Sequence, residues 1–413
     1  MKKEQTFLLA LLSSAFDSGR AVPAPDFSEK EWKAFIAESF YQAVGVLAFS
    51  LCEPFMDRVP SDLYSHWNRA IIKTMGRNRN VATAQNELVA LLGNRPYLIL
   101  KGLASAAYYP NSTLRDFGDV DFLVEEKRQT EISELLCSNG YQSEGEGNDH
   151  HIVFKKPFCH LELHREPPGI PGGAAGDKIR SFFGKILETA VLQTLDADYL
   201  HAVFRAPASE MHGLILLLHM QHHMLEEGLG LRHLLDWGFY VAKTEKEPFW
   251  QEALLPLLKE VGLLTFAAAM TKTCAIYLGA PEPEFCRNIP DDLCAGVMED
   301  IFALGNFGMK DRGRSHSAAL TENDGNSVRK KSAFRVFHGI VTSKHPILQR
   351  APILYPIFAV GEAFAYGFGA LFGKRTRPSK LFRSAKERKT LYNRLAIFQT
   401  GNTRSDFPTD SIS

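Results

Sequence analysis

The chain has 413 residues, a length typical of two or three structural units rather than one compact core. Hydrophobic residues make up 45% and charged residues 23%, as in ordinary soluble globular proteins. The 47 Lys and Arg residues balance the 47 Asp and Glu residues, so the chain has no overall attraction for polyanions. This balance excludes bulk nucleic-acid binding of the histone kind, and any polyanion site must be local.

The six cysteines show no CxxC pair and no Cys/His ligand spacing. This pattern favours reduced, buried thiols and a cytoplasmic location. The N-terminal lysines and the apolar stretch after them are similar to a signal peptide, but Glu4 and Gln5 interrupt the charged region. We interpret the stretch as a first helix, because its apolar residues form one helical stripe: Phe7, Leu8, Leu11, Leu12 and Phe16.

Residues 1–95 have the pattern of an N-terminal helical region. Ser28 and Glu31 form an S-x-x-E capping box, which predicts the start of a helix that runs toward Cys52. Ser61 or Asp62 begins another long helical pattern, which ends at the Gly93-Asn94-Arg95-Pro96 segment.

Residues 96–170 change to an α/β pattern. Short apolar runs predict strands, and amphipathic runs between them predict helices. The expected elements are a strand at Tyr97–Leu100, a turn at Lys101-Gly102, helical turns over Leu103–Tyr109, a strand at Val120–Val124, a helix at Glu131–Cys137, and a hairpin of His151–Phe154 with Cys159–Leu163.

Helical periodicity returns in residues 171–303, which we expect to form a larger helical lobe. The helical stripes are Phe182–Leu192, Met211–Leu225, Leu229–Val241, Trp250–Val261 and Leu264–Leu278. Residues 304–332, rich in Gly, Ser, Asn and charge, predict a flexible loop. The fold class is therefore α+β: a small mixed sheet between an N-terminal helical region and a C-terminal helical lobe.

Residues 333–413 form a hydrophobic and basic C-terminal region. Within it, Ala351–Gly373 is nearly all apolar, Glu362 is its only charge, and basic residues flank it. The prolines and glycines in this segment weaken a straight helix. We rank a buried or partner-facing helix first, peripheral membrane contact second and a membrane span third.

The strand at Val120–Val124 carries the pattern with the clearest chemistry. Asp119 and Asp121 stand two positions apart, so both side chains point to one face of the strand. Neighbouring carboxylates repel each other unless a divalent cation neutralises them, and Mg²⁺ (or Mn²⁺) prefers such oxygen ligands. The pair therefore predicts a metal site.

Glu162 is the candidate third carboxylate, because Leu161 and Leu163 occupy the opposite face of its strand. Glu162 lies 41 residues after Asp121, which leaves room for a helix and a hairpin, so the two strands can be neighbours. A third carboxylate would complete a two-metal site. His164 lies on the same strand face and is a weaker candidate beside the metals.

Lys101-Gly102 is the expected anion-binding turn. Glycine lets a phosphate approach the backbone, and Lys101 adds a compact positive charge. Arg115 offers a planar fork for a phosphate or for Asp116.

The histidines of the Met211–Leu225 stripe have a spacing that can bind zinc. His219, His222 and His223 stand at i, i+3 and i+4. We interpret them instead as helix packing with possible polar contacts to substrate. Arg232 and Asp236, at i and i+4, are consistent with an intrahelical ion pair.

The Lys-Gly turn, the R-x-x-G-D-h-D strand and the later h-E-h strand resemble the nucleotidyltransferase superfamily that includes DNA polymerase beta. The closest resemblance is to the bacterial uncharacterised nucleotidyltransferase family (NTP_transf_5). It implies that Asp119, Asp121 and Glu162 are metal carboxylates and that Lys101 and Gly102 bind the β and γ phosphates of an NTP. It also raises Asp236 as a residue that orients the nucleotide or the lobe.

One departure from the superfamily pattern concerns the turn. The usual turn is Gly-Gly or Gly-Ser, whereas Leu103 follows Gly102 here, and Ser105 is the candidate to replace the missing hydroxyl. The predicted reaction is metal-dependent transfer of an NMP from an NTP to a hydroxyl of a protein, sugar or small molecule. Two alternatives remain: a catalytically inactive nucleotide-binding or regulatory protein, and a membrane-peripheral partner of a modifying pathway.

Overall fold

The computed structural model describes residues 1–146, 151–157 and 159–310, and short stretches at 321–323, 328–330, 338, 341–342, 345, 355–356, 358–362 and 388–399. Most of the predicted loop 304–332 and most of Ala351–Gly373 lie outside the described residues. Within 304–332, β8 (Thr321–Asn323) and β9 (Val328–Lys330) pair as antiparallel strands where a loop is expected. Among the described residues, no helix is both long and apolar enough to cross a membrane.

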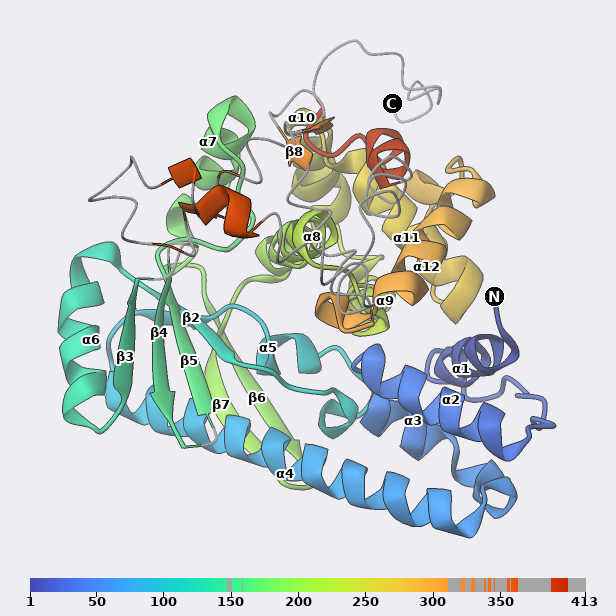
Figure 1. Cartoon of the computed structure of the whole chain (residues 1–413). Coiled ribbons are helices and arrows are strands. Elements are labelled where there is room, and N and C mark those ends of the chain that lie inside the picture. The colour runs from blue at the N-terminus through green and yellow to red at the C-terminus, as the bar shows by residue number, and fades with distance from the viewer. Residues whose placement is uncertain are drawn as a thin grey trace.

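The N-terminal region is helical, as predicted. It consists of α1 (Lys3–Ser13), α2 (Glu29–Tyr41), α3 (Gly45–Leu51), the 3-10 helix η1 (Glu53–Arg58) and α4 (Ser61–Leu92). The capping box that begins α2 is present, because Ser28 Oγ accepts from the Glu31 N–H and Glu31 Oε2 accepts from the Ser28 N–H. The long helix α4 lies under both the N-terminal helices and the sheet (Figure 1).

The predicted continuation of α2 to Cys52 is wrong, because the helix ends at Tyr41 and Ala43 adopts a positive φ of 53°. Gln42 explains the break. Its side-chain oxygen accepts from the Leu231 N–H at 3.0 Å, and its backbone oxygen accepts from the Arg232 N–H at 3.2 Å. Gln42 therefore caps the start of a helix far along the chain instead of continuing its own.

The sheet has five strands in the order β1-β2-β5-β4-β3. The strands are β1 (Tyr97–Ile99), β2 (Val120–Val124), β3 (Gln142–Glu146), β4 (His151–Lys156) and β5 (Cys159–His164). Only the β2–β5 pair is parallel, so the sheet is mixed as predicted. Between the strands lie α5 (Leu103–Ala106), η2 (Ser112–Leu114), η3 (Glu126–Arg128) and α6 (Gln129–Ser138).

A second, two-stranded sheet follows, and it corrects the prediction of a helix over Phe182–Leu192. Helix α7 (Gly173–Phe182) ends where the predicted helix would begin, and within the predicted range only η4 (Phe183–Lys185) is helical. The strand β6 (Val191–Ala197) then pairs with β7 (Leu200–Ala206). Asp198 makes the turn with a positive φ of 48°. Along β7, Leu200, Ala202, Phe204 and Ala206 alternate with exposed residues, so only one face of the hairpin is buried.

The helical lobe closes the fold and confirms the α+β architecture. It contains α8 (Ser209–Glu226), α9 (Leu231–Thr244), the π-helical η5 (Trp250–Leu254), α10 (Leu255–Glu260), α11 (Leu264–Leu278), η6 (Glu284–Cys286), α12 (Asp291–Leu304) and η7 (Asn306–Gly308). One hydrophobic core joins this lobe to the N-terminal helices, and a second lies between the sheet, α4 and the β6–β7 hairpin. In Figure 1 the lobe sits beside one end of the sheet.

Candidate active site between the sheet and the helical lobe

The pairing of the two central strands brings together two acidic side chains from distant parts of the chain. β2 and β5 run parallel, and their register places Asp121 opposite Glu162. The alternation of the strands sends Phe122 and Leu161 into the core, which leaves the two carboxylates on the other face. The prediction that these strands are neighbours is confirmed.

His164 completes a tight group with the two carboxylates. Its Nε2 lies 2.9 Å from Asp121 Oδ1 and 3.5 Å from Glu162 Oε2. One ligand atom from each of the three residues lies within 4.8 Å of the others. These two oxygen donors and one nitrogen donor form a set that a divalent cation can bind.

Two pKa shifts describe the electrostatics of this group. Burial alone would lower the pKa of His164, but its hydrogen bonds to Asp121 and Glu162 outweigh burial and raise that pKa. Burial alone would raise the pKa of Asp121, but the Lys101 ammonium and His164 outweigh it and lower that pKa. Asp121 therefore stays ionised and available as a ligand at neutral pH.

Asp119 lies in the same cavity but outside the tight group. Its side chain is 47% exposed, compared with 5% for Asp121, and its Oδ1 lies 3.4 Å from His160 Nδ1. Partial burial and the nearby carboxylates of Glu162 and Asp121 raise the pKa of Asp119. A divalent cation would relieve this repulsion.

The Lys101-Gly102 turn lies directly beside the carboxylates. Lys101 Nζ is 3.1 Å from Asp121 Oδ1 and 2.8 Å from His219 Nε2 on α8. Gly102 has φ 70° and ψ −110°, a combination that residues with a Cβ rarely adopt. The glycine is therefore required by the backbone of the turn itself.

Arg115 lines the cavity described below, but its guanidinium is bound to Asp236 and not to the Asp116 carboxylate. Its Nε and Nη2 donate to Asp236 Oδ1 and Oδ2 at 2.8 and 2.7 Å, and only the backbone oxygen of Asp116 contacts its Nη1. Tyr109 also donates to Asp236 Oδ1 at 2.8 Å. Both oxygens of Asp236 are thus bound by residues of the α/β core, rather than by Arg232 along its own helix.

Ser105 is fully buried, and its Oγ lies 3.4 Å from His212 Nε2. It is not among the residues that line the cavity described below. Burial lowers the pKa of His212 to about 4, so the serine faces a neutral imidazole. The expectation that Ser105 replaces the usual hydroxyl of the turn therefore does not fit its position.

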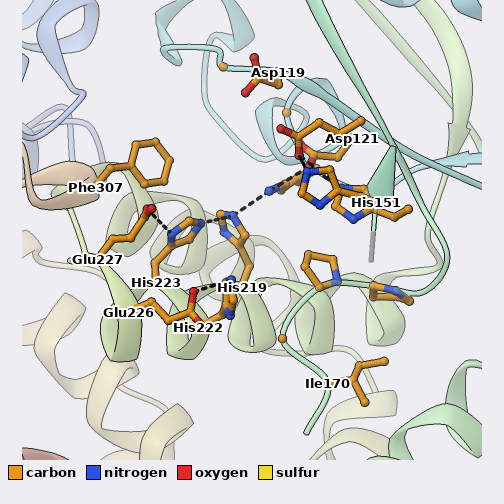
Figure 2. A pocket seen from close by; sticks show the side chains of 18 of the residues that line it. Asp119, Asp121, His151, Ile170, His219, His222, His223, Glu226, Glu227 and Phe307 are labelled. Atoms are coloured by element: carbon orange, nitrogen blue, oxygen red, sulfur yellow. Dashed lines mark hydrogen bonds and ion pairs between the residues drawn. The ribbon is translucent and has the colours of Figure 1, made fainter. Parts of the chain in front are cut away.

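A cavity of about 760 Å³ separates the carboxylates from the helical lobe. The sheet side includes Asp119, Asp121, Glu162 and His164, and the turn adds Lys101 and Gly102. The lobe side is lined by His219, His222, His223, Glu226, Glu227, Arg232 and Phe307 (Figure 2). The cavity is large enough for a nucleotide-sized ligand.

The lobe contributes functional candidates that the sequence does not single out. His233 packs beside His219 and His223, whereas His222 faces Glu226 at 3.3 Å. Phe307 has a positive φ of 54° and lies beside His223 and His233. The spacing of the α8 histidines is visible in the sequence, but nothing in it links them to position 233 or 307.

A known protein family matches a part of the chain that is larger than this cavity. The family model described as "Uncharacterised nucleotidyltransferase" matches residues 28–279, which include the sheet, the turn and the histidines of the lobe. No curated protein and no solved structure matches the chain significantly. Because the match covers more than half of the 413 residues, the chain belongs to this uncharacterised nucleotidyltransferase family.

Proposed function

We propose that the protein transfers a nucleoside monophosphate from an NTP to an acceptor hydroxyl, with Mg²⁺ or Mn²⁺ held by Asp119, Asp121 and Glu162. The observation that carries the proposal is the β2–β5 register, which sets Asp121 opposite Glu162 at the wall of a nucleotide-sized cavity. Family membership supports nucleotidyl transfer in general.

The donor set fits a hard divalent cation. Asp121 and Glu162 supply carboxylate oxygens within 4.8 Å of each other, and Asp119 supplies a third carboxylate that lines the same cavity. When bound, such ions would neutralise phosphate charge and lower the pKa of an acceptor hydroxyl. His164 would keep the Asp121 carboxylate oriented through its 2.9 Å contact.

Lys101 would bind the β and γ phosphates. Its ammonium now lies between Asp121 and His219, where it already compensates a buried negative charge. Its side chain is 18% exposed and lines the cavity, so it can turn toward an anion that enters there. Gly102 keeps the turn close to the backbone of Asp119. The backbone oxygen of Asp119 lies 3.8 Å from the place that a Cβ on Gly102 would take.

A second candidate function is nucleotide binding without transfer. Two residues expected to bind phosphate have other partners, because Arg115 is bound to Asp236 and Ser105 is buried against His212. Loss of both contacts would leave Lys101 and Gly102 as the phosphate ligands from the turn. This smaller set of phosphate ligands supports the candidate in which an NTP binds but no transfer follows.

The experiment that tests the proposal is incubation of the protein with each α-³²P-labelled NTP, Mg²⁺ or Mn²⁺, and cell extract. We expect transfer of label to an acceptor and a loss on the order of 100-fold in both Asp121→Asn and Glu162→Gln. The matched control is Glu144→Gln, an exposed carboxylate paired with Lys155 on the same sheet.

Equal labelling by the wild type and Asp121→Asn contradicts the transfer reaction. Saturable NTP binding without any transfer, measured by calorimetry on the same preparation, instead supports the second candidate. If label is transferred, the acceptor can be identified from the labelled product, because protein, sugar and small-molecule products separate by size and charge.

A further inference from the structure

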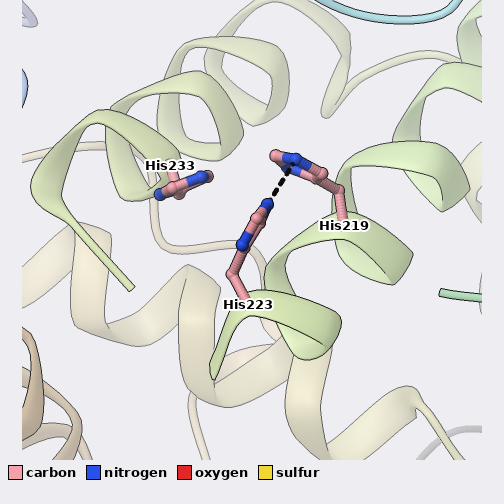
Figure 3. Close-up of side chains that lie close together, drawn as sticks. All are labelled: His219, His223 and His233. Atoms are coloured by element: carbon pink, nitrogen blue, oxygen red, sulfur yellow. Dashed lines mark hydrogen bonds between the residues drawn. The ribbon is translucent and has the colours of Figure 1, made fainter. Parts of the chain in front are cut away.

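Three histidines from two helices of the lobe converge on one point beside the cavity. His219 and His223 lie one turn apart on α8, and His233 faces them from the first turn of α9 (Figure 3). One ring nitrogen from each lies within 4.8 Å of the other two. The ring centroids are 4.2 to 5.2 Å apart.

We propose that His219, His223 and His233 bind one divalent transition-metal ion of the Zn²⁺ class, at a site separate from the carboxylates of the sheet. Imidazole nitrogens favour Zn²⁺ and its neighbours in the transition series, whereas Mg²⁺ prefers hard oxygen ligands. Three protein ligands leave a fourth position open toward the cavity, as in metal sites that bind a further ligand.

His219 Nε2 has two neighbours that compete for its one hydrogen-bonding position. Both Lys101 Nζ and His223 Nε2 lie 2.8 Å from it, yet this nitrogen has one lone pair or one hydrogen. If it accepts from Lys101, it cannot also form a linear hydrogen bond with His223. A metal ion removes the conflict, because both imidazoles then direct lone pairs at the same cation.

The unpartnered nitrogen of His233 is the second observation. His233 is 2% exposed, and within the described part of the chain its Nε2 has no hydrogen-bond partner. An unpaired buried nitrogen is costly unless something else binds it. Figure 3 shows its ring directed at the other two histidines, so a shared cation would supply the missing partner.

Glu227 is the third observation. Its Oε2 lies 3.4 Å from His223 Nδ1, the nitrogen on the outer side of that ring (Figure 2). Metal-binding histidines usually direct their second nitrogen at a carboxylate or carbonyl, which fixes the tautomer and aims the other nitrogen at the metal. The contact is of ion-pair length and is not a hydrogen bond, because His223 Nδ1 has no hydrogen-bond partner within the described part of the chain; Glu227 is therefore placed to accept from Nδ1 once Nε2 binds the metal.

Binding of the metal requires small, identifiable movements. Nitrogens at about 2.0–2.1 Å from a tetrahedral ion lie about 3.3 Å apart, so His219 and His223 must separate slightly from their present 2.8 Å. Lys101 must leave His219, and His233 must give up the long 3.3 Å contact between its Nδ1 and the Gly230 N–H. The metal would thus release Lys101 toward Asp121 or toward an anion in the cavity.

Cobalt titration of the full chain tests the site directly. The protein is stripped with a chelator and titrated with Co²⁺, and its visible absorption and its displacement by Zn²⁺ are recorded without any nucleotide. We expect one Co²⁺ per chain and at least a tenfold loss of affinity in His223→Ala. His222→Ala, one residue away on the same helix, should retain binding, because His222 faces Glu226 outside the cluster.

Three results would overturn the site: no saturable Co²⁺ binding by the wild type, equal binding by His223→Ala, or loss of binding only in Asp121→Asn. X-ray absorption of the Zn²⁺-loaded wild type decides the matter even if a variant fails to fold. Three imidazole nitrogens around the ion support the proposal, and a shell of oxygens contradicts it. Because no nucleotide is present, this result is independent of the transfer reaction.

Discussion

The guanidinium of Arg115 and the carboxylate of Asp236 form a two-pronged ion pair, with contacts of 2.8 and 2.7 Å, across the boundary between the α/β core and the helical lobe. Arg115 lies just before β2, and Asp236 lies on α9. Both side chains are about 5% exposed. This pair joins the helix that carries His233 to the segment that leads into the strand carrying Asp121.

Asp236→Asn should destabilise the protein by about 3–5 kcal/mol, because it leaves the Arg115 charge buried without its partner. Urea denaturation measures the change. The double variant Arg115→Met with Asp236→Leu should recover much of that loss, since it removes both charges together. If the losses in unfolding free energy caused by Arg115→Met and Asp236→Leu simply add in the double variant, the two residues do not form a direct pair.

Tyr109→Phe, which deletes one hydrogen bond to Asp236, should lower the free energy of unfolding by about 1 kcal/mol.

Local patterns in the sequence predict the part of the site that a single sheet builds. The two-residue spacing of Asp119 and Asp121, and the apolar flanks of Glu162, depend only on strand periodicity. The β2–β5 register then brings Asp121 and Glu162 together. The capping box at Ser28 is equally local, because all of its atoms lie within one turn of helix.

Contacts between distant segments explain what the sequence does not predict. The partner of Arg115 lies 121 residues away, and several acidic residues nearer in the chain are equally plausible partners. Gln42 ends α2 because it caps α9, which cannot be inferred from the sequence around it. β6 has an exposed, weakly alternating pattern, so its pairing with β7 and not its own residues defines it as a strand.

Gly102→Ala should destabilise the turn by about 1–3 kcal/mol and reduce nucleotidyl transfer. The cause is the φ of 70° with ψ −110°, because within the described residues no neighbouring atom lies closer than 3.8 Å to the added Cβ. Gly118→Ala is the matched control, since Gly118 lines the same cavity and does not need a positive φ, and no atom of the described part of the chain lies within 4 Å of the place a Cβ would take. Thermal denaturation and the labelling assay should separate the two. Equal effects would show that steric bulk, and not backbone conformation, matters.

Lys101→Met should change metal and nucleotide binding in opposite directions. The ammonium lies 3.1 Å from Asp121 Oδ1, so its removal frees that oxygen for a divalent cation. We expect Mn²⁺ to bind about tenfold more tightly in the absence of NTP, which corresponds to about 1.4 kcal/mol. NTP affinity should fall, because a phosphate ligand is lost. Electron paramagnetic resonance measures the affinity for Mn²⁺, and calorimetry measures the affinity for NTP. Lys127→Met, at an exposed lysine, is the control for both measurements. Weaker binding of both ligands would contradict competition between Lys101 and the metal.

Asp116 should make the stability of the protein fall as the pH rises from about 4 to above 6. Burial raises the pKa of Asp116 from 3.8 to about 6, and the backbone N–H groups of Gly45 and Val46 and the charge of Arg232 only partly offset burial. Its Oδ1 has no hydrogen-bond partner within the described part of the chain. The folded state therefore holds a proton that the unfolded chain releases at lower pH. That stabilisation is complete below pH 3.8 and is lost as the pH passes through about 6.

Asp116→Asn should remove this dependence, because an amide of the same shape carries no charge to bury. Relative to the variant, the wild type should lose up to about 3 kcal/mol of unfolding free energy across the window, since each pKa unit corresponds to about 1.4 kcal/mol. Urea denaturation at pH 4.5, 6 and 7.5 gives the difference directly, and contributions of the other titrating groups cancel between the two proteins. Asp177→Asn, at a side chain 76% exposed, should follow the wild type at every pH. A difference between the wild type and Asp116→Asn that stays constant with pH would show that Asp116 is ionised throughout, and that Arg232 and the amides at the start of α3 fully compensate its burial.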